Sequence, residues 1–392
     1  MTFYVSSIAF LLKTRLLRRI GFQNALLSAL CFITTLLLAE IAYTAMNGLG
    51  TNLGSDYVPY QVNHWRPNAR YTYCGIPAYK NEFCVTHQNN SLGYNDEEHG
   101  VDKPPGVYRI LVLGDSFVEA FQVKLENTFH KVLEARLNEK GLEVEVLAMG
   151  KSGWGAVRAL EALEEEGLAY EPDLVILEFL GGNDVRDSTP NLAQQYLKGR
   201  KETWLHPELK KFLLGRFDLS YYFVASIDRL YKRRQEPIPF DFQVYDPQKY
   251  EVDPSWSEAW EITFDAIQRM KRISEANGAA LLVVSFTSKW EIASYEGQPQ
   301  LREALQRGLK MGAFADRFDF QLPDKVMADF TREADIHYLQ LNPLFANIRE
   351  REGPDVRFHW VYDGHRNERG HQEAAEAIRD YLDSHFSMEL RR

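Results

Sequence analysis

The sequence predicts an α/β fold: a doubly wound, flavodoxin-like parallel sheet of about five strands with helices on both faces. Two observations predict it. Short runs of β-branched and aliphatic residues recur at regular spacing after residue 106. Amphipathic segments that end at glycine, as helices often do, separate these runs. Strands that alternate with helices are joined by right-handed crossovers, which place the strands parallel to one another.

The expected elements follow in order. Strands are predicted at 109–113, 144–149 and 173–179, which read RILVL, VEVLAM and DLVILEF. The helices NTFHKVLEARLNEKG and GAVRALEALEEEG lie between them. A long helix, WSEAWEITFDAIQRMKRISEANG, leads into the strand AALLVVSF, and ADIHYLQL is a fifth strand before the closing helix ERGHQEAAEAIRDYLDSHF. This α/β domain covers 106–388, and the segment at about 186–255 fits no part of the repeat, so we expect a helical insertion there.

The N-terminal part predicts a membrane anchor. Residues 25–45 read ALLSALCFITTLLLAEIAYTA, with Glu40 as their only charge, and about 20 such residues span a bilayer as a helix. Four basic residues and no acidic one precede this run: Lys13, Arg15, Arg18 and Arg19. The positive-inside rule then keeps residues 1–24 cytoplasmic and places the main domain in the periplasm or outside the cell. A cleaved signal peptide and a buried helix of a soluble core are the alternatives.

Residues 46–105 are rich in Asn, Tyr, Pro and Gly and are expected to form an extended lead-in that packs on the main domain. Cys74 and Cys84 bracket the short segment CGIPAYKNEFC, which an oxidising compartment would allow to close as a disulfide. Two unpaired thiols are the alternative. The net charge of -10 argues against a nucleic-acid partner, because such a partner favours a basic surface.

Ser116 follows the first predicted strand directly, in RILVLGDSFVEAF. Ligands of doubly wound sheets bind beyond the carboxyl ends of the strands, which is where this serine is expected. Its hydroxyl is therefore a candidate nucleophile, and its backbone N–H is a candidate oxyanion donor. A plain helix cap is the alternative interpretation.

The next two strands end in turns that carry further donors. GKSGWG follows the second strand and offers the backbone N–H of Gly153, and LGGND follows the third and offers the side-chain amide of Asn183. Two backbone donors beside an amide are what an oxyanion hole requires. Ordinary loops, which Gly, Asn and Asp favour, are the alternative.

A serine nucleophile needs a general base and a group that orients the base. Asp363 and His365 lie two residues apart in VYDGHRNERGH, with Gly364 between them to permit a tight turn just before the closing helix. We expect this loop to return to the same edge of the sheet. The carboxylate would then hold one imidazole nitrogen while the other faces Ser116.

These four stretches resemble the sequence blocks of the SGNH (GDSL) hydrolases, in the family's order, over roughly residues 106–385. The resemblance extends more softly to NNSLGYND, which is similar to membrane-anchored bacterial members. It implies that Ser116 is the nucleophile, that His365 is the general acid and base, and that Asp363 orients it. It also implies an oxyanion hole made by the N–H groups of Ser116 and Gly153 and by the Asn183 amide, with no metal or organic cofactor.

The sequence departs from the family pattern in two places. The acid commonly lies three residues before the histidine, whereas Asp363 lies two before His365. Ala148 stands where an asparagine is often found ahead of the block II glycine. His371 is expected to be a supporting residue, and Asp115 and Asp184 are expected to hold turns.

The predicted function is a serine esterase that acts on O-acyl esters of cell-envelope glycans or lipids. Two alternatives remain: an O-acyltransferase of envelope polysaccharide, which needs the same residues, and a non-catalytic glycan-binding module with the same fold.

Overall fold

The computed structural model describes residues 22–47, 67–74, 82–201, 240–309, 312 and 315–386. The chain divides into two compact units, residues 1–55 with 199–237 and residues 56–198 with 238–392. In the first unit the described element is the helix α3 (Phe22–Asn47). The sheet and the candidate site belong to the second unit. Most of the predicted cytoplasmic segment 1–24 and the middle of the predicted insertion, 202–239, lie outside the described residues.

The segment predicted to span a membrane, residues 25–45, lies within α3. Among the helices in the described part of the chain, none is both long and apolar enough to cross a bilayer, so the predicted span is not supported.

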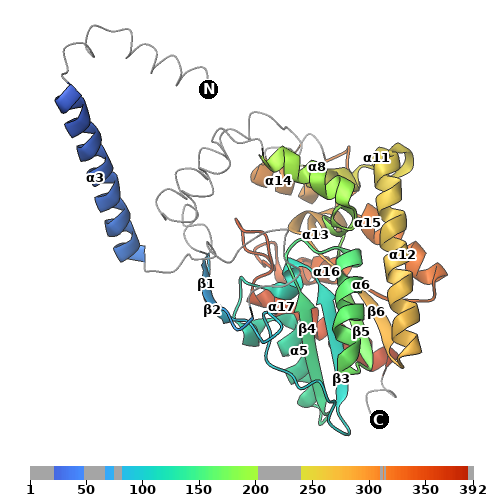
Figure 1. The fold of residues 1–392 in the computed structure, drawn as a ribbon. Coiled ribbons are helices and arrows are strands. Elements are labelled where there is room, and N and C mark those ends of the chain that lie inside the picture. The colour runs from blue at the N-terminus through green and yellow to red at the C-terminus, as the bar shows by residue number, and fades with distance from the viewer. Residues whose placement is uncertain are drawn as a thin grey trace. The chain divides into compact units, whose positions relative to one another are not determined.

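In the described residues the central sheet has five parallel strands, in the order β4-β3-β5-β6-β7 (Figure 1). Their bounds are β3 (Tyr108–Gly114), β4 (Val144–Gly150), β5 (Leu174–Leu180), β6 (Ala280–Phe286) and β7 (His337–Gln340). Counted along the chain this is the order 2-1-3-4-5, the flavodoxin-like arrangement. The prediction of an α/β fold with a parallel sheet is therefore confirmed, and each predicted strand is present within a few residues of its expected bounds.

Side chains of the strands alternate between two hydrophobic cores, one on each face of the sheet. Leu111 of β3 packs in the core under α6 (Ala156–Glu165) and α12 (Pro254–Ala276). Its neighbour Ile110 packs in the other core, under α5 (Phe129–Asn138) and α17 (Glu368–His385). Figure 1 shows these pairs of helices on opposite sides of the strands. Because both faces are buried, the strands are apolar throughout, which is why the sequence shows continuous apolar runs rather than alternation.

The remaining elements connect the strands at the two ends of the sheet. Helices that follow β3, β4 and β5 are α4 (Ser116–Glu119), η2 (Leu125–Asn127), η3 (Gly167–Tyr170), α7 (Asp184–Asp187) and α8 (Pro190–Lys201). Those nearer the C-terminus are η4 (Phe240–Tyr245), α11 (Pro247–Val252), α13 (Lys289–Glu296), α14 (Gln298–Leu309), α15 (Leu322–Glu333) and α16 (Asn342–Glu352). Most of the chain between β6 and β7, where α13, α14 and α15 lie, has no predicted element.

Part of the lead-in forms an antiparallel pair of strands, β1 (Arg70–Cys74) and β2 (Cys84–Gln88). In the register of this pair, Cys74 lies opposite Cys84. Cys84 is disulfide-bonded, whereas Cys31 in α3 is free and exposed. The lead-in thus contains a hairpin whose second strand begins at a disulfide.

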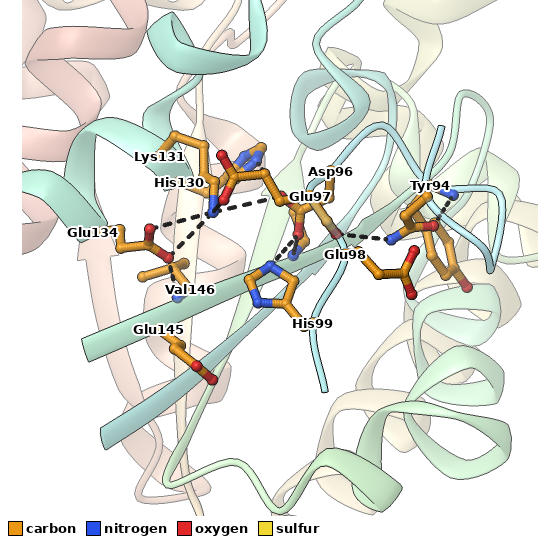
Figure 2. A network of polar contacts seen from close by, with 12 residues as sticks. Tyr94, Asp96, Glu97, Glu98, His99, His130, Lys131, Glu134, Glu145 and Val146 are labelled. Atoms are coloured by element: carbon orange, nitrogen blue, oxygen red, sulfur yellow. Dashed lines mark hydrogen bonds and ion pairs between the residues drawn. The ribbon is translucent and has the colours of Figure 1, made fainter. Parts of the chain in front are cut away.

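The strand β4 lies at the edge of the sheet, and side chains satisfy its outward N–H groups. Asn138 Oδ1 accepts from Val144 at 2.8 Å, Glu134 Oε2 accepts from Val146 at 2.7 Å, and Asp96 Oδ2 accepts from Ala148 at 2.8 Å. Figure 2 shows the Glu134 and Asp96 side chains beside β4. An unpaired edge would invite pairing with another strand, and these acceptors prevent it.

Asp96 is the centre of a buried cluster of polar side chains (Figure 2). Its carboxylate lies 3.3 Å from His99 Nε2, 3.5 Å from His130 Nε2 and 3.8 Å from Lys131 Nζ. Burial alone would raise the pKa of Asp96, but the hydrogen bonds from His130 and His99 and the charge of Lys131 outweigh it and hold the pKa well below its usual value. The lead-in is thus joined to α5 and β4 by a carboxylate that stays ionised.

We expect Asp96→Asn to lower the free energy of unfolding by about 3 kcal/mol, because the amide lacks the charge that strengthens the bonds which the buried carboxylate accepts from the Ala148 N–H and from His130. Chemical denaturation measured at several pH values checks this. Since the folded pKa of Asp96 is depressed, its contribution is fully present above about pH 4 and is lost as the pH falls below that value. The matched control is Asp102→Asn at an exposed site of the same segment, and equal stabilities of the two variants would contradict the prediction.

Candidate functional site

Ser116 lies at the carboxyl end of the sheet, as the first residue of α4. The N-cap of this short helix is Asp115, whose Oδ1 accepts the Phe117 N–H at 2.8 Å. The serine hydroxyl is therefore not needed as a cap. A Cβ on Gly150 would lie 2.5 Å from Val118 Cβ, so the glycine that ends β4 lets α4 cross close to that strand.

The structure brings Ser116, His365 and Asp363 together. His365 Nε2 lies 2.9 Å from Ser116 Oγ, and His365 Nδ1 lies 2.6 Å from Asp363 Oδ1. An ionised carboxylate can only accept, so Nδ1 carries the hydrogen and Nε2 of the neutral ring accepts from the serine hydroxyl. This is the arrangement in which a histidine removes a proton from a serine.

The charges around His365 favour its protonated form. Burial alone would lower the pKa of His365. The hydrogen bond that its ring donates to Asp363 and the charge of Asp363, together with the charges of Asp115 and Glu119, outweigh burial and raise the pKa above 6.5. For Asp363, burial alone would raise the pKa, and the contacts with His365 lower it below the usual value. The pair is thus an ionised carboxylate beside a histidine that gains a proton readily.

A tight turn accounts for the spacing of two residues between Asp363 and His365. Gly364 has φ of 92°, a left-handed conformation that side chains other than glycine rarely adopt. Asp363 Oδ1 accepts the backbone N–H of His365 at 3.2 Å as well as the ring N–H. Outside the turn, the Trp360 N–H donates to the His365 carbonyl at 2.8 Å. The short spacing is therefore compatible with contact between the carboxylate and the ring.

Each of the three predicted oxyanion donors follows the carboxyl end of a strand, and Ser116 comes two residues after the end of β3. Gly153, with φ of 81°, follows β4, and Asn183 is the N-cap residue of α7 after β5. Asn183 Nδ2 donates to Asp115 Oδ2 at 2.7 Å, and because the amide has two hydrogens, one remains for a ligand. In the described part of the chain, the backbone N–H groups of Ser116 and Gly153 donate to no other residue.

Glu119 is a buried carboxylate that the sequence analysis did not select. It lies on α4 three residues after Ser116, and its Oε2 accepts the Ser152 N–H at 3.0 Å and also the Ser152 hydroxyl. It therefore holds the residue next to Gly153. The spacing of three on a helix was the available signal, since it places both side chains on one face.

Acidic side chains also lie beneath the turns. Glu178 of β5 accepts the Asp115 N–H at 3.0 Å, and Asp184 accepts the Leu180 N–H at 2.8 Å. Burial, followed by the charges of neighbouring carboxylates, raises the pKa of both Glu178 and Asp184 well above the usual range. Both acids hold backbone turns. Among the residues described, no group of three or more His, Cys, Asp or Glu side chains is placed to hold a metal ion.

The residues that follow His365 anchor its loop in the core. The Arg366 side chain is fully buried, with its guanidinium carbon 4.3 Å from the ring centre of Phe286 and an N–H donated to Thr287 Oγ1 at 3.1 Å. Burial lowers the pKa of Arg366 to about 9. His371 is also buried and accepts the Phe129 N–H at 3.1 Å, while burial lowers its pKa well below the usual value. His371 is therefore a neutral supporting residue that does not contact Ser116.

Comparison with known proteins gives likenesses to esterases among solved structures. An acetyl xylan esterase, AlAXEase, is 10% identical over 70% of this chain and 99% of its own, with a TM-score of 0.39. TesA is 13% identical over 70% of this chain and 98% of its own, with a TM-score of 0.38. A lipase/acylhydrolase from Enterococcus faecalis is 12% identical over 71% of this chain and 96% of its own, with a TM-score of 0.37.

No family model matches the sequence, and no curated protein matches it. What the site can do chemically follows from its own contacts.

Proposed function

We propose that the chain is a serine-dependent ester hydrolase that acts on O-acyl esters through an acyl-enzyme. The observation that carries the proposal is the line of contacts from Ser116 Oγ to His365 Nε2 at 2.9 Å and from His365 Nδ1 to Asp363 at 2.6 Å. A serine that only capped a helix, or a histidine solvated in a loop, would have no reason to make these two contacts. Nucleophile, base and orienting acid are the three parts that acyl transfer to serine requires.

In the first half of the reaction, Ser116 Oγ attacks the ester carbonyl carbon while His365 Nε2 takes the hydroxyl proton. The carbonyl oxygen becomes an oxyanion, for which the N–H groups of Ser116 and Gly153 and the Asn183 amide are the donors. The carbon–oxygen bond to the leaving alcohol then breaks, and His365 returns its proton to that oxygen. The product is an acyl ester of Ser116 and a free alcohol.

In the second half, His365 takes a proton from water, and the resulting hydroxide attacks the acyl carbon. Collapse of this second oxyanion breaks the bond to Ser116 Oγ, which recovers the proton from His365. The carboxylic acid is released and the site is restored. A sugar hydroxyl in place of water would give acyl transfer by the same residues.

The Asp363 charge stabilises the imidazolium that forms in both halves, because Asp363 remains ionised beside it. The substrates expected from the sequence, O-acylated glycans or lipid esters of a cell envelope, rest on the predicted membrane location.

Covalent trapping tests the proposal directly. The full-length protein is incubated with a fluorophosphonate, which reacts with activated serines. The adduct is then mapped by peptide mass spectrometry. One adduct at Ser116 is expected, and its rate should follow the ionisation of His365. Labelling at other serines only, or at none, would contradict the proposal.

Hydrolysis of p-nitrophenyl esters from acetate to longer acyl chains then defines the acyl preference. A burst of nitrophenol without steady turnover in water, relieved by a sugar alcohol, would identify acyl transfer as the physiological outcome. A trapped serine with no turnover under either condition would favour the glycan-binding alternative.

A further inference from the structure

One carboxylate outside the α/β domain accepts three consecutive backbone N–H groups of the loop that carries Asp363. Glu82 Oε1 accepts from Val361 at 2.6 Å, and Glu82 Oε2 accepts from Tyr362 at 3.0 Å and from Asp363 at 3.1 Å. A carboxylate has about four acceptor positions, so all three bonds fit on one group. Bonds from N–H groups to an ionised carboxylate are stronger than those to neutral acceptors.

The bonds to Glu82 act on the backbone in the middle of this loop. The Val361 side chain is 39% exposed and the Tyr362 side chain is 55% exposed, so burial of these side chains does not fix the loop. The turn's own bonds use the N–H groups of Trp360 and Gly364, at its two ends. The three N–H groups between them bond to Glu82, while Lys289 Nζ donates to the Val361 carbonyl at 3.1 Å.

Glu82 belongs to the disulfide-bonded hairpin of the lead-in. It lies two residues before Cys84, which is disulfide-bonded and begins β2. Between them Phe83 is buried, with its ring centre 5.5 Å from that of Trp360 in the loop. The end of the hairpin therefore contacts the loop through the Glu82 carboxylate and the Phe83 ring.

We propose that Glu82 is a positioning residue, which holds the loop so that Asp363 and His365 are in line with Ser116 and which depends on the disulfide hairpin for its own place. This inference rests on the proposed function, since it assigns Glu82 a part in the same site. Glu82 touches no reacting group. Its effect passes through the backbone of Asp363, whose carboxylate holds the His365 ring.

The first test is Glu82→Gln, which keeps the size of the side chain but removes its charge and one acceptor oxygen. We expect kcat to fall about 10-fold to 100-fold with KM changed less than about 3-fold, because small displacements of catalytic groups cost rates of this order. Asp363 raises the pKa of His365, so loosening Asp363 should also move the acidic limb of the kcat/KM profile to lower pH. Simple loss of folded protein would not move that limb.

Glu98→Gln is the matched control, because Glu98 is an exposed carboxylate of the lead-in that also accepts a backbone N–H, from Ser91 at 2.8 Å. It should leave kcat and the pH profile unchanged. Glu82→Asp keeps the charge on a shorter side chain and should recover part of the activity. A Glu82→Gln enzyme with the same kcat and the same acidic limb as the parent would overturn the inference.

A second measurement does not depend on ester turnover. Hydrogen exchange of a peptide that covers residues 361–363 should be faster in Glu82→Gln, and faster in the parent after reduction of the disulfide with dithiothreitol. If the parent shows no Ser116-dependent turnover but exchange still responds to Glu82, the proposed function fails while the contact holds. If neither Glu82→Gln nor reduction of the disulfide changes the exchange rate of this peptide, the role of Glu82 itself is overturned.

Discussion

Replacing Ser116 by alanine is expected to lower the turnover of an acyl ester by about 10³-fold to 10⁴-fold, to a residual rate set by binding and the oxyanion donors. The reason is that no other side chain in the described site has an oxygen within hydrogen-bond distance of His365 Nε2. Steady-state hydrolysis of p-nitrophenyl acetate and longer esters, corrected for the rate in buffer, measures this.

The Ser116→Ala protein should remain folded. Asp115, not Ser116, caps α4 through its bond to the Phe117 N–H, so the helix keeps its cap in the variant. Stability should change by less than about 1 kcal/mol, as for loss of one hydroxyl hydrogen bond. A thermal melt next to the parent therefore separates loss of the nucleophile from loss of the fold.

Ser384→Ala is the matched control for the same chemical change. Ser384 is exposed on α17 and its hydroxyl donates only to the Asp380 carbonyl, one turn earlier. Its turnover should equal that of the parent. Turnover of folded Ser116→Ala at the level of Ser384→Ala would remove the basis for a serine mechanism.

The sheet could be predicted from the sequence because both of its faces are buried. A strand such as Leu174–Leu180 is buried at every position, so it appears in the sequence as an uninterrupted apolar run. Helices between β6 and β7 gave a weaker pattern. In α13 (Lys289–Glu296), Glu291 is buried and forms a capping box with Ser288, so apolar periodicity alone could not predict this helix.

The candidate site could be predicted where the rule for strand ends applies. Ser116, Gly153 and Asn183 each follow a strand of a parallel sheet, and the carboxyl ends of such strands meet at one edge. His365 and Asp363 were found from their own spacing and from the expected return of the loop. The rule for strand ends thus identified three of the five residues, and the spacing of Asp363 and His365 identified the other two.

Contacts made by the lead-in could not be predicted in the same way. Glu82 and Asp96 lie in a segment with no helical or strand period, and their partners are in β4, α5 and the loop before α17. In the sequence alone, nothing distinguishes an acidic residue that accepts hydrogen bonds in the fold from one that is solvated. Only the folded chain reveals that each accepts bonds from backbone far along the sequence.

Asp363→Asn should lower kcat by about 10³-fold to 10⁴-fold near neutral pH, because the amide no longer stabilises the imidazolium and can hold the wrong ring tautomer. The variant should also shift the pH dependence of activity in a defined direction. The hydrogen bond that the His365 ring donates to Asp363 and the charge of Asp363 raise the pKa of His365 above 6.5, and His365 must be neutral to act as a base. Activity of the parent should therefore rise with pH through a value above 6.5, and the acidic limb of the variant should lie at lower pH.

Comparison of the two pH profiles separates the roles of Asp363. If the carboxylate only fixed the turn through the His365 N–H, the asparagine oxygen would replace it and neither kcat nor the limb would move far. If it holds the ring as well, both change together, since the ring N–H and the backbone N–H share Asp363 Oδ1. Asp355→Asn, at an exposed position earlier in the same connection, should reproduce the parent in both respects. A variant with normal kcat and a normal limb would therefore reduce the site to a serine and a histidine, with the shorter spacing of the acid as the structural reason.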